Sequence, residues 1–456
     1  MGAKTVLPGA RSGCVSVPAS KSWAHRILIT AALSGKECRI ECDGISADIR
    51  ATVKCLNGLG ADIAIIEKEK EQDMTVIRVS PIKKTVDQTG ERVLYAPLFC
   101  GESGSTLRFL IPVAGALGIN SVFHMEGRLS ERPLEPLISV LSEHGMSFRR
   151  DGKYLYCSGQ LKSGKFSIPG NISSQYISGL LMALPVLEGD SILEITEKIE
   201  SGDYIAMTVR AVEEAGIRLD RTGNTYRIKG SQKYIVPEKM VVEKDWSSAA
   251  FPLSMGAFSE VGMTVTGLNL YSVQGDKEIA DILMRFGAGV YVVTDEEKGI
   301  FSLSEYKKLV EAHPHLRNRL VAVQVKKGML KGQTIDASAI PDLVPVISAV
   351  AAGAEGKTAI INAARLRIKE SDRLATTTDM LKRLGAGIEE TEDGLVIRGG
   401  SMLTGGTVDS FNDHRIAMSA AVAAGICKEP VEVNGAECTD KSFPGFWEML
   451  ERIEIL

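Results

Sequence analysis

The chain repeats itself, and this constrains its fold more than any other feature. One landmark is a glycine between an apolar-periodic stretch and a strand-like run, at intervals of 85, 71, 71 and 98 residues. The other is a polar residue before a small, apolar, helix-like stretch, at intervals of 83, 70, 72, 97 and 71 residues. The glycines are Gly60, Gly145, Gly216, Gly287 and Gly385, and the polar residues are Ser20, Ser103, Ser173, Asp245, Asp342 and Asp413. Two independent landmarks in step indicate six copies of one unit.

Each copy is predicted to contain strands and two helices. The first helix begins at the polar residue, which suits an N-cap, and the second ends at the glycine, a usual residue after a helix C-terminus. The longer gap before the fifth copy predicts an insertion near Glu296–Arg319. A glycine at a helix end is common in α/β proteins, so one series alone would prove little. The regular spacing of both series favours an α/β repeat protein.

Length and charge set further bounds. A chain of 456 residues exceeds what one hydrophobic core usually supports, which predicts two domains. The net charge is −4, and this argues against a surface that binds nucleic acid as a whole. Any basic site for an anion must therefore be local, and the placement of individual Lys and Arg residues is informative.

Cysteines, histidines and apolar runs give no sign of a metal site, secretion or a membrane. The eight cysteines include no C-x-x-C pair, and the six histidines have no H-E-x-x-H spacing. The N-terminus lacks an apolar signal core, and the most apolar run, Phe109–Ile119, is too short to span a bilayer. We expect a cytoplasmic protein with no membrane partner.

The polar residues at the helix starts favour anionic ligands. Several helix N-termini directed at one site would attract phosphate and carboxylate groups. In P-A-S-K-S-W-A-H-R, Lys21 and Arg26 place two cations at a helix start, which costs stability unless an anion neutralises them. In G-E-S-G-S-T-L-R, glycines allow a close approach to a ligand, and Ser105 and Arg108 can contact an oxyanion. That second signal is weak alone, since Gly-Ser turns often precede helices.

Other candidates have ordinary alternatives. Arg132, in E-R-P, fits a ligand clamp or a surface ion pair, and alone the surface pair is favoured. The stretch Asn171–Tyr176 offers hydroxyls and an amide for a phosphate or a polyol, or simply a helix cap. Asp342, in I-P-D-L, would be kept ionised by nearby cations and could act as a base, or could be an N-cap.

The C-terminal region is denser in charge. R-L-R-I-K-E-S-D-R brings Lys369, Glu370 and Arg373 together, N-D-H-R adds Arg415, and T-D-K-S-F-P adds Lys441. Each stretch alone could be solvated charge. Together with Lys21, Arg26 and Arg132, these stretches supply seven cations at or beside the helix starts, more than one phosphate needs.

These motifs resemble those of the 5-enolpyruvylshikimate-3-phosphate synthase family. P-x-S-K-S-x-x-x-R, G-E-S-G-S-T-L-R, E-R-P, S-S-Q, I-P-D, K-E-S-D-R-L, N-D-H-R-x-A-M and K-S-F-P follow one another in the family's order. The matches run from about residue 17 to residue 444. Eight ordered motifs are far more specific than any one of them.

The resemblance implies a fold. The family has two similar domains, each of three βαβαββ repeats, in an inverse α/β barrel. We expect the chain to cross between domains near residues 19 and 242. The N-terminal domain would be residues 19–242, and the C-terminal domain would be residues 1–18 plus 243–456.

The resemblance also implies a reaction. The family transfers the enolpyruvyl group of phosphoenolpyruvate to the 5-hydroxyl of shikimate 3-phosphate and releases phosphate, without a metal or organic cofactor. By motif matching, shikimate 3-phosphate would be held by Ser22, Arg26, Ser173, Ser174, Gln175, Ser201, Tyr204 and Lys369. Phosphoenolpyruvate and its departing phosphate would be bound by Lys21, Gly104, Arg132, Arg373, Arg415 and Lys441. Asp342 would take the hydroxyl proton while contacting that substrate, and Glu370 with Lys21 would manage the proton at the methylene carbon.

Some positions depart from the family pattern, and two other functions are alternatives to the family's reaction. Glu102, Ser103, Ser105 and Phe109 replace commoner residues, and Arg365 stands where some members carry Asn. One rival is the enolpyruvyl transferase that acts on UDP-N-acetylglucosamine, but no cysteine here lies in the Gly-rich, Arg-containing loop of that family. The other is a silent anion-binding scaffold, which would be expected to lack Asp342, Glu370 or Lys441. We expect a monomer whose partners are its two substrates, with no nucleic acid.

Overall fold

A computed structural model describes residues 2–66, 74–83, 95–294 and 299–456. The chain divides into two compact units: Lys21–Val242, called here the N-terminal unit, and Met1–Ser20 with Glu243–Leu456, called here the C-terminal unit. Crossings near residues 19 and 242 were expected from the sequence, and the division falls after Ser20 and after Val242.

The N-terminal unit contains three four-stranded sheets of one topology. In each sheet two parallel strands are followed by an antiparallel hairpin, in the orders β14-β3-β5-β4, β6-β7-β9-β8 and β10-β11-β13-β12. The elements, with 3-10 helices written η, are α1 (Lys21–Ala32), β3 (Cys38–Cys42), α2 (Ala47–Gly58), β4 (Asp62–Ile66), β5 (Thr75–Ser80), β6 (Ala96–Gly101), α3 (Gly104–Leu117), β7 (Ser121–Met125), η1 (Gly127–Glu131), α4 (Leu137–Glu143), β8 (Ser147–Asp151), β9 (Tyr154–Ser158), β10 (Lys165–Pro169), α5 (Ser174–Ala183), η2 (Leu184–Val186), β11 (Ser191–Thr196), α6 (Gly202–Glu214), β12 (Leu219–Thr222), β13 (Thr225–Ile228) and β14 (Lys239–Val241).

The C-terminal unit follows the same plan with variations. Its sheets have the orders β17-β16-β18-β15-β2-β25, β19-β20-β22-β21 and β1-β24-β23. The elements are β1 (Ala3–Val6), β2 (Arg11–Ser16), α7 (Trp246–Gly256), β15 (Met263–Leu268), η3 (Gly275–Glu278), α8 (Ile279–Phe286), β16 (Gly289–Thr294), β17 (Gly299–Ser302), α9 (Leu303–Ala312), η4 (Pro314–Asn318), β18 (Val321–Lys326), β19 (Thr334–Asp336), η5 (Pro341–Leu343), α10 (Val344–Gly353), β20 (Gly356–Ile361), η6 (Ala364–Ile368), α11 (Arg373–Arg383), β21 (Gly387–Glu390), β22 (Leu395–Gly399), β23 (Gly406–Asp409), α12 (His414–Ala423), η7 (Ala424–Ile426), β24 (Val431–Asn434), η8 (Ala436–Lys441), α13 (Phe446–Arg452) and β25 (Glu454–Ile455).

Three sheets are completed by strands from distant parts of the chain. Strand β14 pairs in parallel with β3, and β2 pairs in parallel with β15. Strand β1 runs antiparallel to β24. In these sheets a strand far away in sequence takes the place of a strand from the same repeat. The six sheets agree with the six copies expected from the sequence, although some copies are not continuous in sequence.

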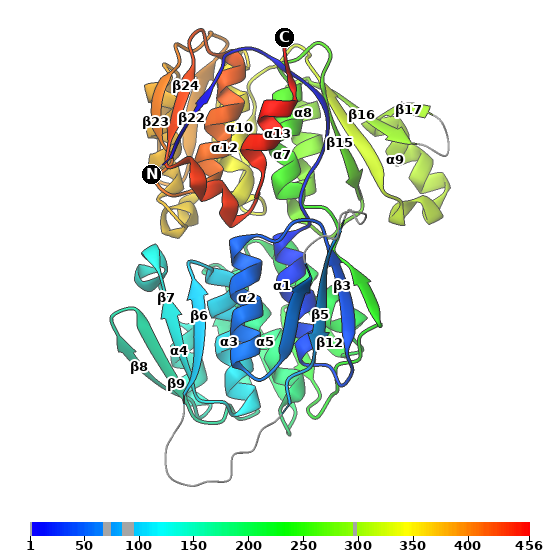
Figure 1. Ribbon diagram of the computed structural model, residues 1–456, viewed down its shortest axis with the longest axis vertical. Coiled ribbons are helices and arrows are strands. Elements are labelled where there is room, and N and C mark those ends of the chain that lie inside the picture. Colours follow the sequence, from blue (N-terminus) through cyan, green and yellow to red (C-terminus); the bar gives the residue numbers. More distant parts are fainter. Residues whose placement is uncertain (1, 67–73, 84–94, 295–298) are drawn as a thin grey trace. The chain divides into compact units, whose positions relative to one another are not determined.

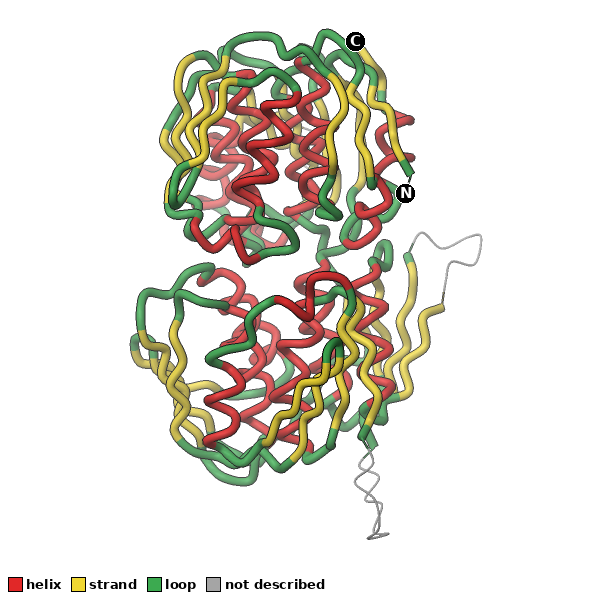
Figure 2. The backbone as a smooth tube through the Cα atoms, turned by 90° about the vertical axis from the view of Figure 1, so that its left-hand side faces the viewer, coloured by secondary structure: helices red, strands yellow, loops and turns green. Residues whose placement is uncertain are grey.

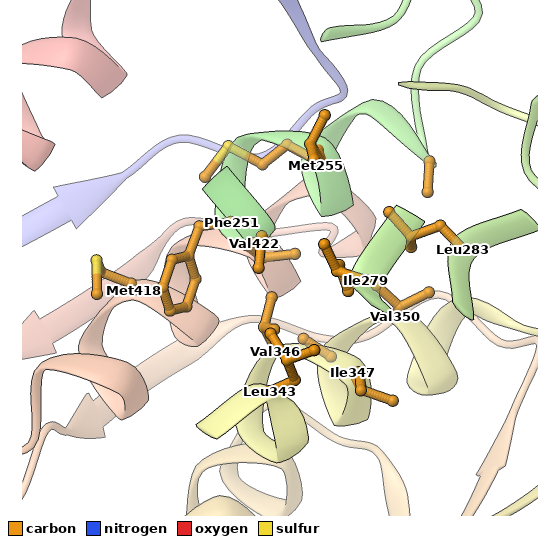
Figure 3. Close-up of a cluster of buried hydrophobic side chains, with 14 of the residues drawn as sticks. Phe251, Met255, Ile279, Leu283, Leu343, Val346, Ile347, Val350, Met418 and Val422 are labelled. Carbon is orange, nitrogen blue, oxygen red and sulfur yellow. The ribbon is translucent and has the colours of Figure 1, made fainter. Parts of the chain in front are cut away.

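Within each unit a group of helices lies inside and the sheets lie outside, as Figures 1 and 2 show, whereas α9 lies at the outside beside β16 and β17. Helices α1, α3, α5, α7, α10 and α12, which begin at the polar landmarks, are buried almost throughout. Helix α8 has one buried face and packs on this interior. Figure 3 shows the resulting core of the C-terminal unit, where Phe251, Ile279, Val346 and Val422 from four helices pack together. A helix that is apolar on every side requires such an interior position.

The landmarks behave mostly as expected. Ser103, Ser173, Asp245 and Asp413 cap their helices, each accepting a hydrogen bond from a backbone N–H of the first turn. All five landmark glycines have positive φ, between 81° and 105°, which suits residues that follow a helix C-terminus. Asp342 differs from these four capping residues, because it lies inside η5, and the N-cap positions of η5 and α10 are Ile340 and Leu343. The N-cap interpretation of Asp342 is therefore wrong.

The insertion lies between two strands that pair with each other. Strands β16 and β18 are antiparallel partners, and β17, α9 and η4 lie between them in sequence. Strand β17 adds an edge to the sheet by pairing with β16. Glu296, at the start of the expected insertion, lies outside the described residues. No helix in the described ranges is both long and apolar enough to cross a membrane.

Candidate functional site

In the C-terminal unit, Asp342 lies at the centre of a cluster of cations. Its Oδ1 accepts a hydrogen bond from Arg373 Nη1 at 2.8 Å and lies 3.7 Å from Lys369 Nζ. Its Oδ2 accepts from Arg415 Nη2 at 2.9 Å, and its backbone oxygen accepts from Arg415 Nη1, also at 2.9 Å. Opposite charges at these distances favour the ionised carboxylate. Three cations that were 4 to 46 residues apart in sequence thus meet on one carboxylate.

Arg373, the first residue of α11, is 1% exposed and joins three carboxylates. Besides Asp342, its Nη2 donates to Glu370 Oε2 at 2.7 Å, and its Nε donates to Asp413 Oδ2 at 2.8 Å. Burial alone would lower the pKa of Arg373, but Asp413, Glu370 and Asp342 outweigh burial and raise it. The guanidinium is therefore a permanent cation held in one orientation.

Lys369 and Lys441 complete the predicted cations of this unit. Burial lowers the pKa of Lys369 to about 8, against the attraction of Asp342, although 28% of the side chain is still exposed. Lys441 ends η8 and donates from Nζ to the backbone oxygen of Asn412 at 2.8 Å, beside the start of α12. The structure thus brings Asp342, Lys369, Glu370, Arg373 and Arg415 into one network, with Lys441 at its margin.

In the N-terminal unit, Arg26 is a buried cation held by neutral groups. Its Nε donates to Thr208 Oγ1 at 2.7 Å, and its Nη2 donates to the backbone oxygen of Tyr204 at 2.8 Å and to Ser178 Oγ at 3.4 Å. The Nη1 group donates to the backbone oxygen of Ser22 at 2.7 Å. Burial lowers the pKa of Arg26 to about 9, which leaves it charged at neutral pH. Because no described carboxylate pairs with it, an anionic ligand would supply the missing counter-charge.

Lys21 begins α1 and is tied to the next helix. Its Nζ lies 3.1 Å from Oδ2 of Asp48 in α2, and both side chains are less than one-fifth exposed. This ion pair fixes the ammonium group at the helix start without enclosing it.

The start of α3 lies against two arginines. A Cβ on Gly104 would come within 2.8 Å of Arg108 Nη1 and within 2.9 Å of Arg132 Nη1, so only glycine leaves both guanidinium groups where they are. Arg108 Nη1 also donates to Gln175 Oε1 at 2.8 Å, while Gln175 Nε2 donates to Ser105 Oγ at 2.9 Å. The guanidinium of Arg132 therefore lies close to the backbone at the start of α3.

The remaining predicted residues lie at the starts of α5 and α6. Ser173 is the N-cap of α5, and the buried Ser174 is its first residue. Ser201 precedes α6 with a φ of 52°, and its side chain makes no cap. Such a backbone conformation is uncommon for a residue with a Cβ and tends to occur at functional sites. Tyr204 is in the first turn of α6, and its backbone oxygen accepts the hydrogen bond from Arg26.

Three acidic partners were missed by the sequence analysis. Asp413 had been marked as a helix start, but its pairing with Arg373 spans 40 residues. Asp48 carries no motif. Asp276 is a buried carboxyl that accepts a hydrogen bond from Ser247; burial, followed by the charge of nearby Asp342, raises its pKa to about 7. Only Asp413, as a polar residue at a repeat landmark, gave a signal that could have been used.

Three of the positions that depart from the family pattern make contacts that explain their local role. Ser103 caps α3, and Phe109 is buried with the guanidinium of Arg26 5.1 Å from its ring centre. Arg365 Nη2 donates to the backbone oxygen of Ser338 at 2.5 Å. Among the described residues, no three His, Cys, Asp or Glu side chains are grouped so that they could hold a metal ion.

Comparisons with known proteins agree on one family. The sequence pattern of the family described as EPSP synthase (3-phosphoshikimate 1-carboxyvinyltransferase) matches residues 7–450. The 3-phosphoshikimate 1-carboxyvinyltransferase of Clostridium acetobutylicum is 42% identical over 452 residues, covering 98% of this chain and 96% of the relative. The protein of that name from Clostridioides difficile is 39% identical, with the same coverage. The structure of an EPSP synthase from Acinetobacter baumannii matches with a TM-score of 0.73 at 26% identity, covering all of both chains.

Proposed function

The chain belongs to the EPSP synthase family, and from this premise we propose that it catalyses the family's reaction through the two clusters described above. It is a 3-phosphoshikimate 1-carboxyvinyltransferase, which transfers the enolpyruvyl group of phosphoenolpyruvate to the 5-hydroxyl of shikimate 3-phosphate and releases phosphate. The single observation that carries the assignment of roles is Asp342, a carboxylate in contact with Arg373, Arg415 and Lys369. This pairing gives a base and phosphate-binding cations in one place.

Arg26 is the anchor for shikimate 3-phosphate in this proposal. A buried cation with neutral protein partners is completed by a phosphate dianion, and charge-assisted hydrogen bonds of this kind are strong. We assign the sugar-like ring to the hydroxyl, amide and phenol groups at the starts of α1, α5 and α6. The assigned residues are Ser22, Arg26, Ser173, Ser174, Gln175, Ser201, Tyr204 and Lys369.

Phosphoenolpyruvate carries a carboxylate and a phosphate, which calls for several cations. Gly104 presents the start of α3 without a side chain, beside the guanidinium of Arg132. Helix N-termini and guanidinium groups both bind such oxyanions. We assign phosphoenolpyruvate and the released phosphate to Lys21, Gly104, Arg132, Arg373, Arg415 and Lys441.

The addition step moves two protons. The 5-hydroxyl loses its proton as its oxygen attacks carbon 2 of phosphoenolpyruvate, and we assign this proton to Asp342. The methylene carbon gains a proton, which we assign to Glu370 acting with Lys21. Glu370 is oriented for this by its 2.7 Å contact with Arg373. When the tetrahedral intermediate collapses, carbon 3 returns a proton to the carboxylate of Glu370, the double bond forms again and the carbon–oxygen bond to phosphate breaks. The leaving phosphate takes up the proton that the 5-hydroxyl lost, and Lys441 and the arginines stabilise the resulting dianion.

The decisive assay is phosphate release from phosphoenolpyruvate with shikimate 3-phosphate as acceptor. UDP-N-acetylglucosamine serves as the parallel acceptor, and the product mass checks the bond formed. We expect release with the shikimate acceptor alone. Release with the sugar nucleotide would move the chain to the other enolpyruvyl transferases, and release with neither would make it a silent binding protein.

We further propose that the enzyme is a cytoplasmic monomer with no nucleic-acid or membrane partner. The net charge of −4 supports the first of these exclusions. Light scattering during size-exclusion chromatography tests the oligomeric state, and a mass twice that of one chain would contradict it.

A further inference from the structure

A chain of buried hydrogen bonds connects three helices of the N-terminal unit. His25 of α1, Thr52 of α2 and Thr106 of α3 are fully buried, as is Ser103, the N-cap of α3. The distance from His25 Nδ1 to Thr52 Oγ1 is 2.7 Å, and Thr52 Oγ1 lies 2.7 Å from Thr106 Oγ1. Thr106 Oγ1 donates to Ser103 Oγ at 2.7 Å. Four polar side chains in an apolar interior thus satisfy one another in a line, here called the relay.

The relay has one direction. The hydroxyl proton of Thr106 goes to Ser103, so Thr106 accepts from Thr52, and Thr52 in turn accepts from His25. This requires a proton on Nδ1 of the imidazole. Nε2 is buried and has no hydrogen-bond partner among the described residues. Burial, then the charges of Lys21 and Arg26, lowers the pKa of His25 well below its usual value. The ring is therefore neutral, with its single proton facing the relay.

Both ends of the relay reach residues assigned to phosphoenolpyruvate. His25 lies one helical turn after Lys21, and Thr52 lies one turn after Asp48, so the Lys21–Asp48 ion pair and the His25–Thr52 hydrogen bond join α1 to α2 on successive turns. At the other end, Ser103 accepts from both the backbone N–H and the hydroxyl of Thr106, which fixes the turn immediately before Gly104.

Arg26 is held by a separate set of contacts. Its partners on other helices are Ser178 of α5 and Thr208 and Tyr204 of α6, none of which is a member of the relay. Two substrates assigned to neighbouring residues are thus supported by different networks.

We propose that His25, Thr52 and Thr106 are positioning residues. They hold Lys21 and the turn at Gly104 in a fixed relative position, in which both can bind phosphoenolpyruvate. The inference rests on the proposed function, since it uses the assignment of Lys21 and Gly104 to that substrate. The three residues do not touch the reacting atoms, and their effect is on binding geometry.

The kinetic test replaces one hydroxyl at the centre of the relay. Thr52→Val keeps the shape of the side chain but breaks both of its hydrogen bonds. We expect the KM for phosphoenolpyruvate to rise by about tenfold, because losing these buried hydrogen bonds loosens the positions of Lys21 and Gly104, while the KM for shikimate 3-phosphate stays within about twofold. Thr52→Ser restores the hydroxyl and should restore the KM. Thr30→Val is the matched control, since Thr30 is buried in α1 but its hydroxyl donates within its own helix, to Ile27.

The outcomes separate the two proposals. Wild-type turnover with both substrates is measured first, and its absence would overturn the proposed function together with this inference. If the wild type is active, equal changes in both KM values, a change no larger than that of Thr30→Val, or no recovery in Thr52→Ser would overturn the relay alone.

A second measurement is made on the wild-type protein and does not use Thr52→Val. Nitrogen-15 spectra of the wild-type histidines report the tautomer of each ring, with the signals of His25 assigned by their loss in His25→Gln. We expect a neutral ring protonated on Nδ1 from pH 6 to pH 8. A ring protonated on Nε2, or one that titrates in this range, would contradict the relay.

Discussion

Replacing Asp413 with Asn should destabilise the C-terminal unit strongly. The carboxylate is fully buried and accepts hydrogen bonds from Arg373 Nε at 2.8 Å, Arg373 Nη2 at 3.3 Å, Ser371 Oγ at 3.0 Å and the backbone N–H of Arg415 at 3.0 Å. Breaking a buried ion pair costs about 3–5 kcal/mol. Arg373 keeps two other carboxylates, and the Asn oxygen can still cap α12, so we expect about 3 kcal/mol. For a unit of more than 200 residues this lowers Tm by about 6–12 °C.

The assay must follow one unit at a time, since a chain with two units need not unfold in one step. Of the three tryptophans, Trp246 and Trp447 lie in the C-terminal unit and Trp23 lies in the N-terminal unit. Urea unfolding followed by fluorescence in a Trp23→Phe background therefore reports on the C-terminal unit. Asp379→Asn is the control, because its ion pair with Arg383 is exposed and should contribute less than about 0.5 kcal/mol.

The pH dependence gives a second check. Burial alone would raise the pKa of Asp413, but the charge of Arg373 outweighs it and the folded-state pKa is lowered. A carboxyl group with a lowered folded-state pKa stabilises the fold above its unfolded pKa, and this contribution is lost as pH falls through the folded value. The difference between wild type and Asp413→Asn should thus stay constant from pH 8 to pH 5 and shrink below about pH 4. A difference under about 1 kcal/mol at pH 7, or one that grows on acidification, would refute the reasoning.

Three further predictions concern activity. Asp342→Ala and Glu370→Gln should each reduce turnover by about a hundredfold or more while phosphate ligands still bind in calorimetry, and near-normal turnover in either variant would overturn its role. The KM for shikimate 3-phosphate should rise above about pH 8, where Lys369 loses its charge, and Lys369→Arg should remove this rise; a rise that persists in the variant would exclude Lys369 as its source. Gly104→Ala should raise the KM for phosphoenolpyruvate by about tenfold, because the added Cβ would lie 2.9 Å from Arg132 Nη1 and displace it, and steady-state kinetics with an unchanged KM would contradict that geometry.

The local part of the fold could be predicted from the sequence, and the long-range part could not. N-caps and glycines after helix ends are set by the first and last turns of each helix, so the repeat was visible. Strand pairing is not local, and from the residues alone nothing in β1 indicates that it pairs with β24, more than 420 residues away. That contact could only be anticipated through the resemblance to a family.

The site divides in the same way. Asp342, Arg373 and Arg415 could be named because they lie at helix starts or in motifs. Their mutual contacts could not be predicted, since an aspartate at a helix start suits an N-cap as well as a base. Asp48, the partner of Lys21, lies 27 residues further on with no motif around it. Such pairings depend on how helices pack, which composition and spacing do not report.

The distant strand pairings also determine the order in which the chain can assemble during synthesis. Strand β14 completes the first sheet of the N-terminal unit as soon as residue 241 has been made. Strand β2 can pair in parallel only after Met263–Thr266 have been made, and β1 must wait much longer, because it needs Val431–Asn434. Strand β1 is thus among the last strands to find its partner, and it remains without β24 until residue 434 has been translated.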